Sequence, residues 1–245
     1  MHVIFNADDF GLTPGVNLGI VDACQSGVVR STTLMVDMAA ERHAVDLALS
    51  ASLLKVGLHL RFTAGAPLTD ISCLVGDNGL FGVKEGFWQR RDFPEQQIAD
   101  EVTAQVEHFL ATGLSLSHID SHHHAHTHPQ ILPVVQEVAR SYQVPLRATG
   151  YHGKAQSDCR YTFEESFYGG GICLDKLLQI INRHNGSCDV LEIMVHPAYV
   201  DQALMDVSSY NILRAKELDI LTDKKLSEAL DELDVTISDY SILLP

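Results

Sequence analysis

Short apolar segments alternate with longer segments of helical periodicity along most of the chain. The short segments are rich in Val, Ile and Leu, as is typical of buried strands, whereas the longer ones are amphipathic. The expected strands are His2–Asn6, Thr32–Val36, Lys55–Leu60, Ser117–Asp120, Val144–Ala148, Val190–Val195 and Val235–Ser238. The expected helices are Val16–Gln25, Glu41–Ser50, Glu95–Ala111, Pro129–Tyr142, Leu174–His184, Tyr210–Leu218 and Asp223–Leu233.

This alternation predicts an α/β fold in which parallel strands are joined by helices. The seven strand segments favour a deformed, seven-stranded (β/α) barrel of the TIM type, and an open doubly wound sheet is the alternative. No repeat or linker divides the sequence, so residues 1–245 are expected to form one domain. In both architectures the ligand binds at the carboxyl ends of the strands, so polar residues there are the candidates for a site.

Two connections, Arg61–Phe93 and Thr149–Gly171, are too long to be simple turns. Loops of this length commonly serve as lids or walls of a binding site. Their aromatic side chains are therefore candidates for contact with a ligand, and among them are Phe87, Trp88, Phe167 and Tyr168.

Composition narrows the range of partners. The net charge of 17 − 32 = −15 disfavours binding to nucleic acid or to an anionic membrane surface. No apolar run approaches the roughly 20 residues of a membrane helix, and the first residues lack the basic and apolar regions of a signal peptide. The five cysteines show no CxxC spacing. We therefore expect a cytoplasmic protein that acts on a small molecule.

Aspartate and histidine residues follow four of the expected strands. Asp8 and Asp9 come after the first strand, His59 ends the third, the segment 121–129 (SHHHAHTHP) follows the fourth, and His196 follows the sixth. Imidazole nitrogens with a carboxylate bind divalent ions, and an open coordination position lets the ion activate water. The pattern therefore predicts metal-dependent hydrolysis at one rim of the fold.

The histidine-rich segment does not by itself make a complete metal site. If it is extended, His122, His124, His126 and His128 share one face and His123 points away. An ion that also takes ligands from other strands has room for only one of them.

Five motifs together resemble the YdjC-like carbohydrate deacetylases, most closely their chitooligosaccharide branch. In order along the chain they are NADDFG (6–11), VGLHL (56–60), HIDSHHHAH (118–126), FYG (167–169) and VHPAY (195–199). The resemblance implies a deformed α/β barrel, one divalent metal ion (Mg²⁺ or Zn²⁺) and removal of N-acetyl groups from small chitin oligosaccharides such as diacetylchitobiose. It also suggests a homodimer.

Carried over to this sequence, the resemblance makes Asp9, His59 and His122 the metal ligands. By analogy with other carbohydrate deacetylases Asp8 becomes the general base, although adjacent aspartates can exchange roles without changing the motif. His196 is expected to be the general acid, on its position alone. The residues expected to contact the substrate are His124, His126, Tyr168 and Tyr199.

Three other interpretations are consistent with the sequence. A metal-dependent phosphoester hydrolase should carry basic residues near its site, and the motifs are accompanied only by scattered Arg61 and Arg147. A non-enzymatic metal-binding protein would chelate several ions through the histidine-rich segment alone. An inactive barrel would have kept Asp8, Asp9, His59, His122 and His196 by accident.

Overall fold

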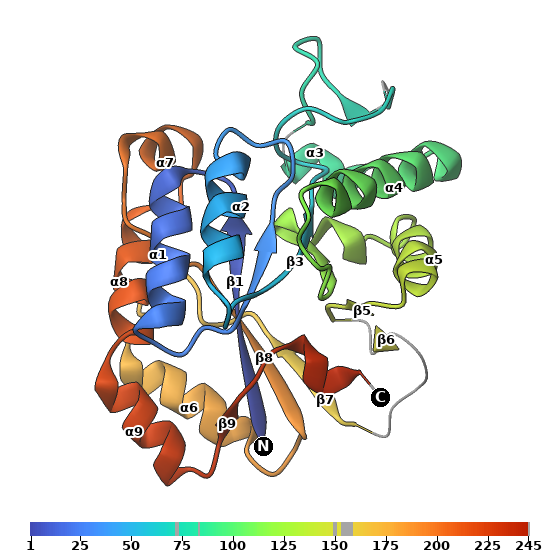
Figure 1. Cartoon of the computed structure of the whole chain (residues 1–245). Helices are drawn as coiled ribbons and strands as arrows, with labels where there is room; N and C mark the ends of the chain where they lie inside the picture. The colour runs from blue at the N-terminus through green and yellow to red at the C-terminus, as the bar shows by residue number, and fades with distance from the viewer. Residues whose placement is uncertain (72–73, 83, 149–150, 153–158, 245) are drawn as a thin grey trace.

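The computed structural model describes residues 1–71, 74–82, 84–148, 151–152 and 159–244. These residues form a nine-stranded sheet in the order β6-β5-β4-β3-β2-β1-β8-β7, with β9 paired to β1 (Figure 1). The strands are β1 (His2–Phe10), β2 (Ser31–Leu34), β3 (Lys55–Leu60), β4 (Ile119–Ser121), β5 (Pro145–Leu146), β6 (Tyr151–His152), β7 (Tyr161–Glu164), β8 (Val190–Val195) and β9 (Thr236–Ile237). The α-helices are α1 (Pro14–Gln25), α2 (Glu41–Ser50), α3 (Lys84–Gln89), α4 (Glu95–Ala111), α5 (Leu132–Tyr142), α6 (Leu174–His184), α7 (Gln202–Val207), α8 (Ile212–Leu221) and α9 (Lys224–Glu232).

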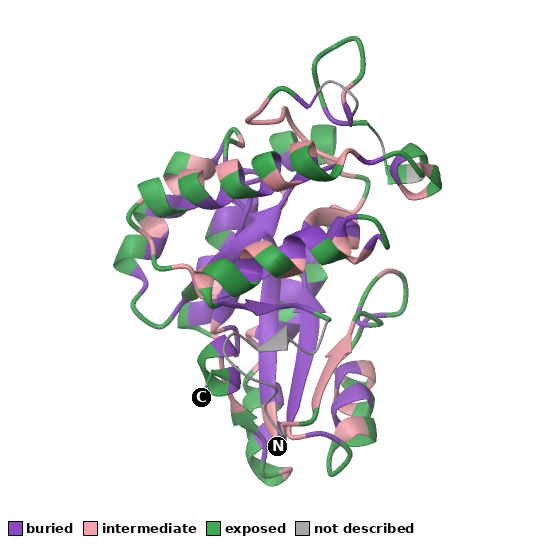
Figure 2. Ribbon diagram, turned by 90° about the vertical axis from the view of Figure 1, so that its right-hand side faces the viewer, coloured by how far each residue is buried: buried purple, intermediate pink, exposed green. Residues whose placement is uncertain are grey.

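The predicted deformed α/β barrel is confirmed. All strand pairs are parallel except β5 with β6, and no ladder joins β6 to β7 within the part of the chain described above. The barrel is therefore open between β5/β6 and β7. Figure 2 shows strands that are largely buried and helices that are exposed on their outer faces. β8 is buried along its whole length, which explains its nearly continuous apolar sequence.

Each expected strand and helix corresponds to an element of the structure, several with the predicted bounds. Lys55–Leu60 and Leu174–His184 match without a shift. Local residue types explain where α4 begins and ends. Pro94 is the N-cap residue at its start, and Gly113 has a positive φ of 85° just after its end.

The two long connections contain further elements, which add short strands to the seven that the sequence predicts. Arg61–Phe93 contains α3, and Thr149–Gly171 contains β6 and the edge strand β7. The pattern missed β7 because its four residues are all half-buried, so no alternation of apolar and polar side chains marks it. α7 was also missed.

Candidate metal centre

Asp9 projects from an irregularity near the end of β1. The first strand runs to Phe10, so both aspartates lie within it rather than after it. The register with β2 shifts between Ala7 and Phe10, and Asp9 has a φ of 70°. Bulges of this kind redirect side chains near functional sites. The backbone therefore turns Asp9 toward a different set of partners from those of Asp8.

His59 is the penultimate residue of β3 and is oriented by Asp120 of β4. Its Nδ1 lies 2.7 Å from Asp120 Oδ1, and its Nε2 lies 3.3 Å from Asp9 Oδ1. Burial acts to lower the pKa of His59, but the charge of Asp120 outweighs it and raises the pKa to about 10. A carboxylate on Nδ1 fixes ring orientation and tautomer in metal sites and leaves Nε2 as the ligand atom.

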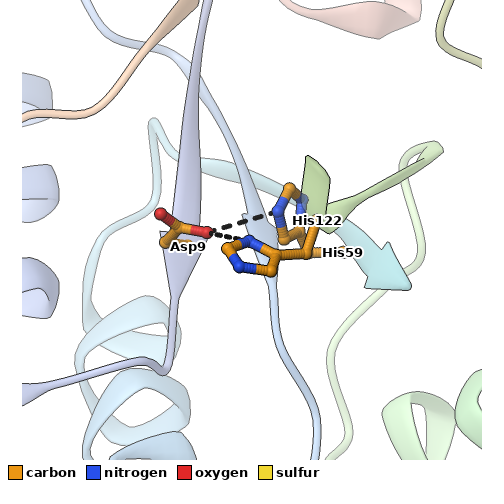
Figure 3. A group of neighbouring side chains, drawn as sticks. All are labelled: Asp9, His59 and His122. Atoms are coloured by element: carbon orange, nitrogen blue, oxygen red, sulfur yellow. Dashed lines mark hydrogen bonds and ion pairs between the residues drawn. The ribbon is translucent and has the colours of Figure 1, made fainter. Parts of the chain in front are cut away.

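His122 contacts the same carboxylate oxygen of Asp9 as His59 does (Figure 3). Its Nδ1 lies 3.0 Å from Asp9 Oδ1, and its ring centroid is 5.7 Å from that of His59. The expectation of an extended histidine-rich segment is wrong, because His122–Thr127 forms a 3-10 helix, η2. His123 and His124 within it have φ values of 54° and 55°, so the histidines do not alternate between two faces.

Asp9, His59 and His122 therefore form one cluster (Figure 3). One donor atom from each lies within 4.8 Å of the other two, although the residues come from β1, β3 and η2. Two imidazole nitrogens and one carboxylate oxygen make a donor set that suits a divalent ion with open positions. These residues thus fit the ion implied by the sequence.

Asp8 lies beside this cluster in a buried ion pair with Arg147. Arg147 Nη1 and Nη2 each donate to one oxygen of Asp8 at 2.7 Å. Burial acts to raise the pKa of Asp8, but the Arg147 guanidinium outweighs it and the pKa lies below its usual value. Asp8 is therefore held ionised and in one orientation.

Arg147 is shared by three carboxylates. Besides Asp8, its Nη1 lies 2.8 Å from Asp120 Oδ2 and its Nε donates to Glu192 Oε1 at 2.6 Å. Asp8, His59 and Asp120 also have donor atoms within 4.8 Å of one another. Because Arg147 already binds both of these carboxylates, that second cluster is poorly suited to a cation.

His196 follows β8, and its side chain is almost completely buried. Its backbone N–H donates to Glu217 Oε2 at 2.5 Å, and its Nδ1 has no hydrogen-bond partner within the described residues. Burial, followed by the charge of Arg214, lowers the pKa of His196 to about 3. The ring is therefore neutral near pH 7.

An aromatic pair covers His196. Tyr168 and Tyr210 stack with ring centroids 4.0 Å apart, and both rings lie within 5.6 Å of the His196 ring. Tyr210 donates to Glu217, and Arg214 Nη2 donates to Asp9 Oδ2 at 2.6 Å. α8 thus connects the surroundings of His196 to Asp9.

The remaining predicted substrate contacts fall in different environments. His126 is completely buried, with Nδ1 on Ser121 Oγ and Nε2 on the carbonyl of Arg147, so neither ring nitrogen is free for a sugar. Tyr199 donates its hydroxyl to Asp22 of α1 in a hydrogen bond at the protein surface. Tyr168 is 46% exposed above His196. These placements favour Tyr168 and disfavour His126 and Tyr199.

His124 lines a pocket of about 530 Å³ at the open side of the barrel. The other lining residues are Trp88, Thr127, Ala148, Phe163, Glu164 and Glu165. His124 Nε2 lies 3.2 Å from Glu165, and Phe163 lies with its ring 5.0 Å from the Arg147 guanidinium carbon. One side chain therefore separates the pocket from the residue that holds Asp8.

Several residues of the site were not predicted: Asp120, Glu192, Tyr210, Arg214 and Glu217. Some signals were present, since Asp120 ends an expected strand and Glu192 interrupts an apolar one. The prediction that Arg147 is a scattered basic residue outside the site is wrong. Arg147 lies within the site, but its charge is neutralised by carboxylates and is not free to bind phosphate.

None of the described helices has the length and apolar character needed to cross a membrane.

Comparison with known proteins gives consistent similarities. A family model described as YdjC-like protein matches residues 2–232. A carbohydrate deacetylase of Vibrio vulnificus is 55% identical over 244 residues, which cover 100% of this chain and 97% of that protein. A carbohydrate deacetylase of Geobacillus stearothermophilus is 40% identical, with 98% and 96% covered.

Two solved structures have a similar fold. One, from Enterococcus faecalis V583, is described in terms of cellobiose-phosphate cleavage; it has a TM-score of 0.89 and 30% identity, and the match covers 99% of this chain and 98% of that one. The other, a family 4 carbohydrate esterase from Streptomyces lividans in complex with acetate, has a TM-score of 0.55 and 12% identity, with 97% and 92% covered. The second similarity concerns the fold alone.

Proposed function

Since the chain belongs to the YdjC-like family, we propose that it is a metal-dependent carbohydrate deacetylase that removes N-acetyl groups from small chitin oligosaccharides such as diacetylchitobiose. The observation that carries the proposal is the placement of Asp8, held by Arg147, beside the Asp9, His59 and His122 cluster. Its relatives named carbohydrate deacetylase support the class of reaction.

Asp9, His59 and His122 would hold the ion. The two imidazoles favour a transition metal such as zinc over magnesium, which prefers oxygen ligands. When bound, such an ion lowers the pKa of a water molecule and polarises a carbonyl oxygen.

Asp8 is the proposed general base. One of its oxygens lies within 4.8 Å of a ring nitrogen of His59, so the carboxylate is next to the ligand set. Because Arg147 keeps it ionised, it can accept the proton of the attacking water. The geometry supports this assignment over the reverse one, since the Oδ1 atom of Asp9 contacts both histidines.

His196 is the proposed proton donor to the departing amine. Its ring is neutral in the resting site, so it must first take up a proton. Proton balance provides one, because the attacking water loses a proton and the amine gains one. In this scheme His196 carries that proton to nitrogen, and acetate and the amino sugar leave.

The pocket lined by Trp88, Phe163 and His124 would hold a sugar ring that is not being deacetylated. Flat aromatic faces with a few polar groups suit a sugar, which has apolar faces and hydroxyl edges. The homodimer suggested by the family resemblance stays a prediction.

The direct test is acetate release from diacetylchitobiose by the zinc-loaded protein and by Asp8→Asn. We expect the substitution to lower kcat at least 100-fold, within the usual contribution of a general base. Asp46→Asn is the matched control, because Asp46 also pairs with an arginine, Arg42, but on the exposed surface of α2. Equal rates for Asp8→Asn and the wild type would remove Asp8 from the mechanism.

Two further measurements separate the alternatives. Hydrolysis of an aryl phosphate without acetate release would favour a phosphoester hydrolase. Metal counting separates an enzyme from a chelator: the proposed site binds one ion per chain and loses it in His59→Gln, whereas chelation by the histidine-rich segment would survive that change.

A further inference from the structure

A chain of buried hydrogen bonds connects the C-terminal segment to Asp8. Glu192, in the middle of β8, is fully buried and uses both oxygens. Oε1 accepts from Arg147 Nε at 2.6 Å, and Oε2 accepts from the hydroxyls of Tyr161 and Tyr240. Arg147 in turn binds both oxygens of Asp8.

We propose that Tyr240 is a positioning residue for the reaction: its hydroxyl fixes Glu192, Glu192 fixes Arg147, and Arg147 fixes Asp8. This inference rests on the proposed function. Tyr240 lies in the 3-10 helix η3 (Tyr240–Leu243), beyond residue 232, where the match to the family model ends. Family membership by itself therefore assigns it no role.

The physical reason is the cost of a buried carboxylate. Glu192 is removed from water, so its charge needs hydrogen-bond donors on each oxygen. Burial raises the pKa of Glu192 in spite of Arg147 and the two hydroxyls. Loss of one hydrogen-bond donor therefore favours the neutral form of the Glu192 carboxyl group. The neutral group binds Arg147 Nε less strongly. The guanidinium is then free to shift between its two other carboxylates, Asp8 and Asp120.

The placement of the Tyr240 ring is independent of its hydroxyl. The ring stacks on His118, with centroids 3.6 Å apart and planes 10° from parallel, and packs with Ile4, Val190 and Leu243. Phenylalanine keeps these contacts and removes only the donor, whose bond to Glu192 Oε2 is 2.5 Å long. Tyr240→Phe therefore isolates the hydrogen bond.

We expect Tyr240→Phe to lower kcat for diacetylchitobiose about tenfold, the size of one lost hydrogen bond to a charged group. KM and the metal content per chain should stay within about twofold, since neither the ligand residues nor the pocket changes. Tyr142→Phe is the matched control, because Tyr142 also donates at 2.5 Å to a glutamate, Glu107, on the exposed surface between α4 and α5.

Tyr161→Phe provides a second variant in case Tyr240→Phe does not fold, because it removes the other donor to the same oxygen. The ¹⁵N–¹H NMR signal of Arg147 Nε reports on the same series of hydrogen bonds without substrate, and we expect it to shift in both variants but not in Tyr142→Phe.

Wild-type kcat with an unshifted Arg147 signal in the folded variants would overturn the proposal, as would a raised KM at constant kcat. No acetate release by the wild type would count against the proposed function, and the NMR signal would then still decide whether Tyr240 positions Arg147.

Discussion

At the scale of single residues, two adjacent aspartates have different partners. Asp8 binds Arg147, whereas Asp9 contacts both His59 and His122 and also binds Arg214. Neighbouring residues of a strand point to opposite faces, and the positive φ of Asp9 adds a further turn. The sequence could predict that the two side chains diverge, but not which partner each one meets.

The pairing of His59 with Asp120 predicts that metal binding depends on pH. The pKa of His59 is about 10 in the ion-free chain, so its ring is charged at pH 7 and must lose a proton before Nε2 can bind an ion. Affinity should therefore rise with pH below that value, about tenfold per pH unit for one proton. Zinc titration between pH 6 and pH 8 measures this slope, and calorimetry in buffers of different ionisation enthalpy counts the proton released.

Asp120→Asn provides the comparison. Asp120 is the main group that raises the pKa of His59, so its loss should flatten the pH dependence near neutrality. The ring should also be less well oriented, at a cost of about 10- to 100-fold in affinity. A wild-type affinity that does not change with pH would contradict the assignment of His59 as ligand.

At the scale of elements, close packing places His196. Gly19 of α1 faces Ala198, just after β8, and a Cβ added at Gly19 would lie 2.4 Å from Ala198 Cα. A backbone atom cannot move aside as a flexible side chain can. The absence of a side chain at Gly19 therefore lets α1 pack against the segment that carries His196.

Gly19→Ala should destabilise the protein by about 1–3 kcal/mol, as expected for overpacking in a buried site. In an unhindered helix the same change would instead stabilise by up to about 1 kcal/mol. Gly86→Ala in α3 is the matched control, because outside its own helix and chain neighbours no atom of the described residues lies within 4 Å of its added Cβ. Urea unfolding monitored by circular dichroism gives both values, and an unchanged midpoint for Gly19→Ala would show that α1 can shift without cost.

Local patterns predicted most elements but not all of them. Amphipathic helices and apolar strands can be recognised in the sequence, because one face of a helix, or all of a central strand, must be apolar to avoid water. η2 was missed because two of its histidines adopt a left-handed backbone that favours no particular sequence pattern. β7 was missed because an edge strand of four half-buried residues carries little apolar signal.

At the scale of the whole molecule, the barrel opens between β5/β6 and β7, and the pocket lies at this opening. Its lining residues belong to α3, η2 and β7, together with Ala148 after β5 and Glu165 after β7. Under the proposed function, this pocket would hold the second sugar unit of the substrate.

Trp88→Leu tests this arrangement, since it keeps an apolar side chain but removes the flat face in the pocket. We expect KM for diacetylchitobiose to rise several-fold while kcat changes little, because Trp88 belongs to neither the ligand set nor the proton-transfer residues. Tyr142→Leu, an aromatic-to-leucine change on the exposed surface, is the control. A fall in kcat with constant KM would place the sugar elsewhere.

The sequence by itself determined the α/β class, the order of most elements, the rim on which the site lies and the family to which the chain belongs. These properties depend on periodicity and on short motifs, which reflect local burial and local chemistry. Tertiary structure decided which side chains meet. Arg147 lies 139 residues from Asp8, and Arg214 lies 205 residues from Asp9. Charges buried together must pair, but many pairings satisfy the same sequence, and only the folded chain selects one of them.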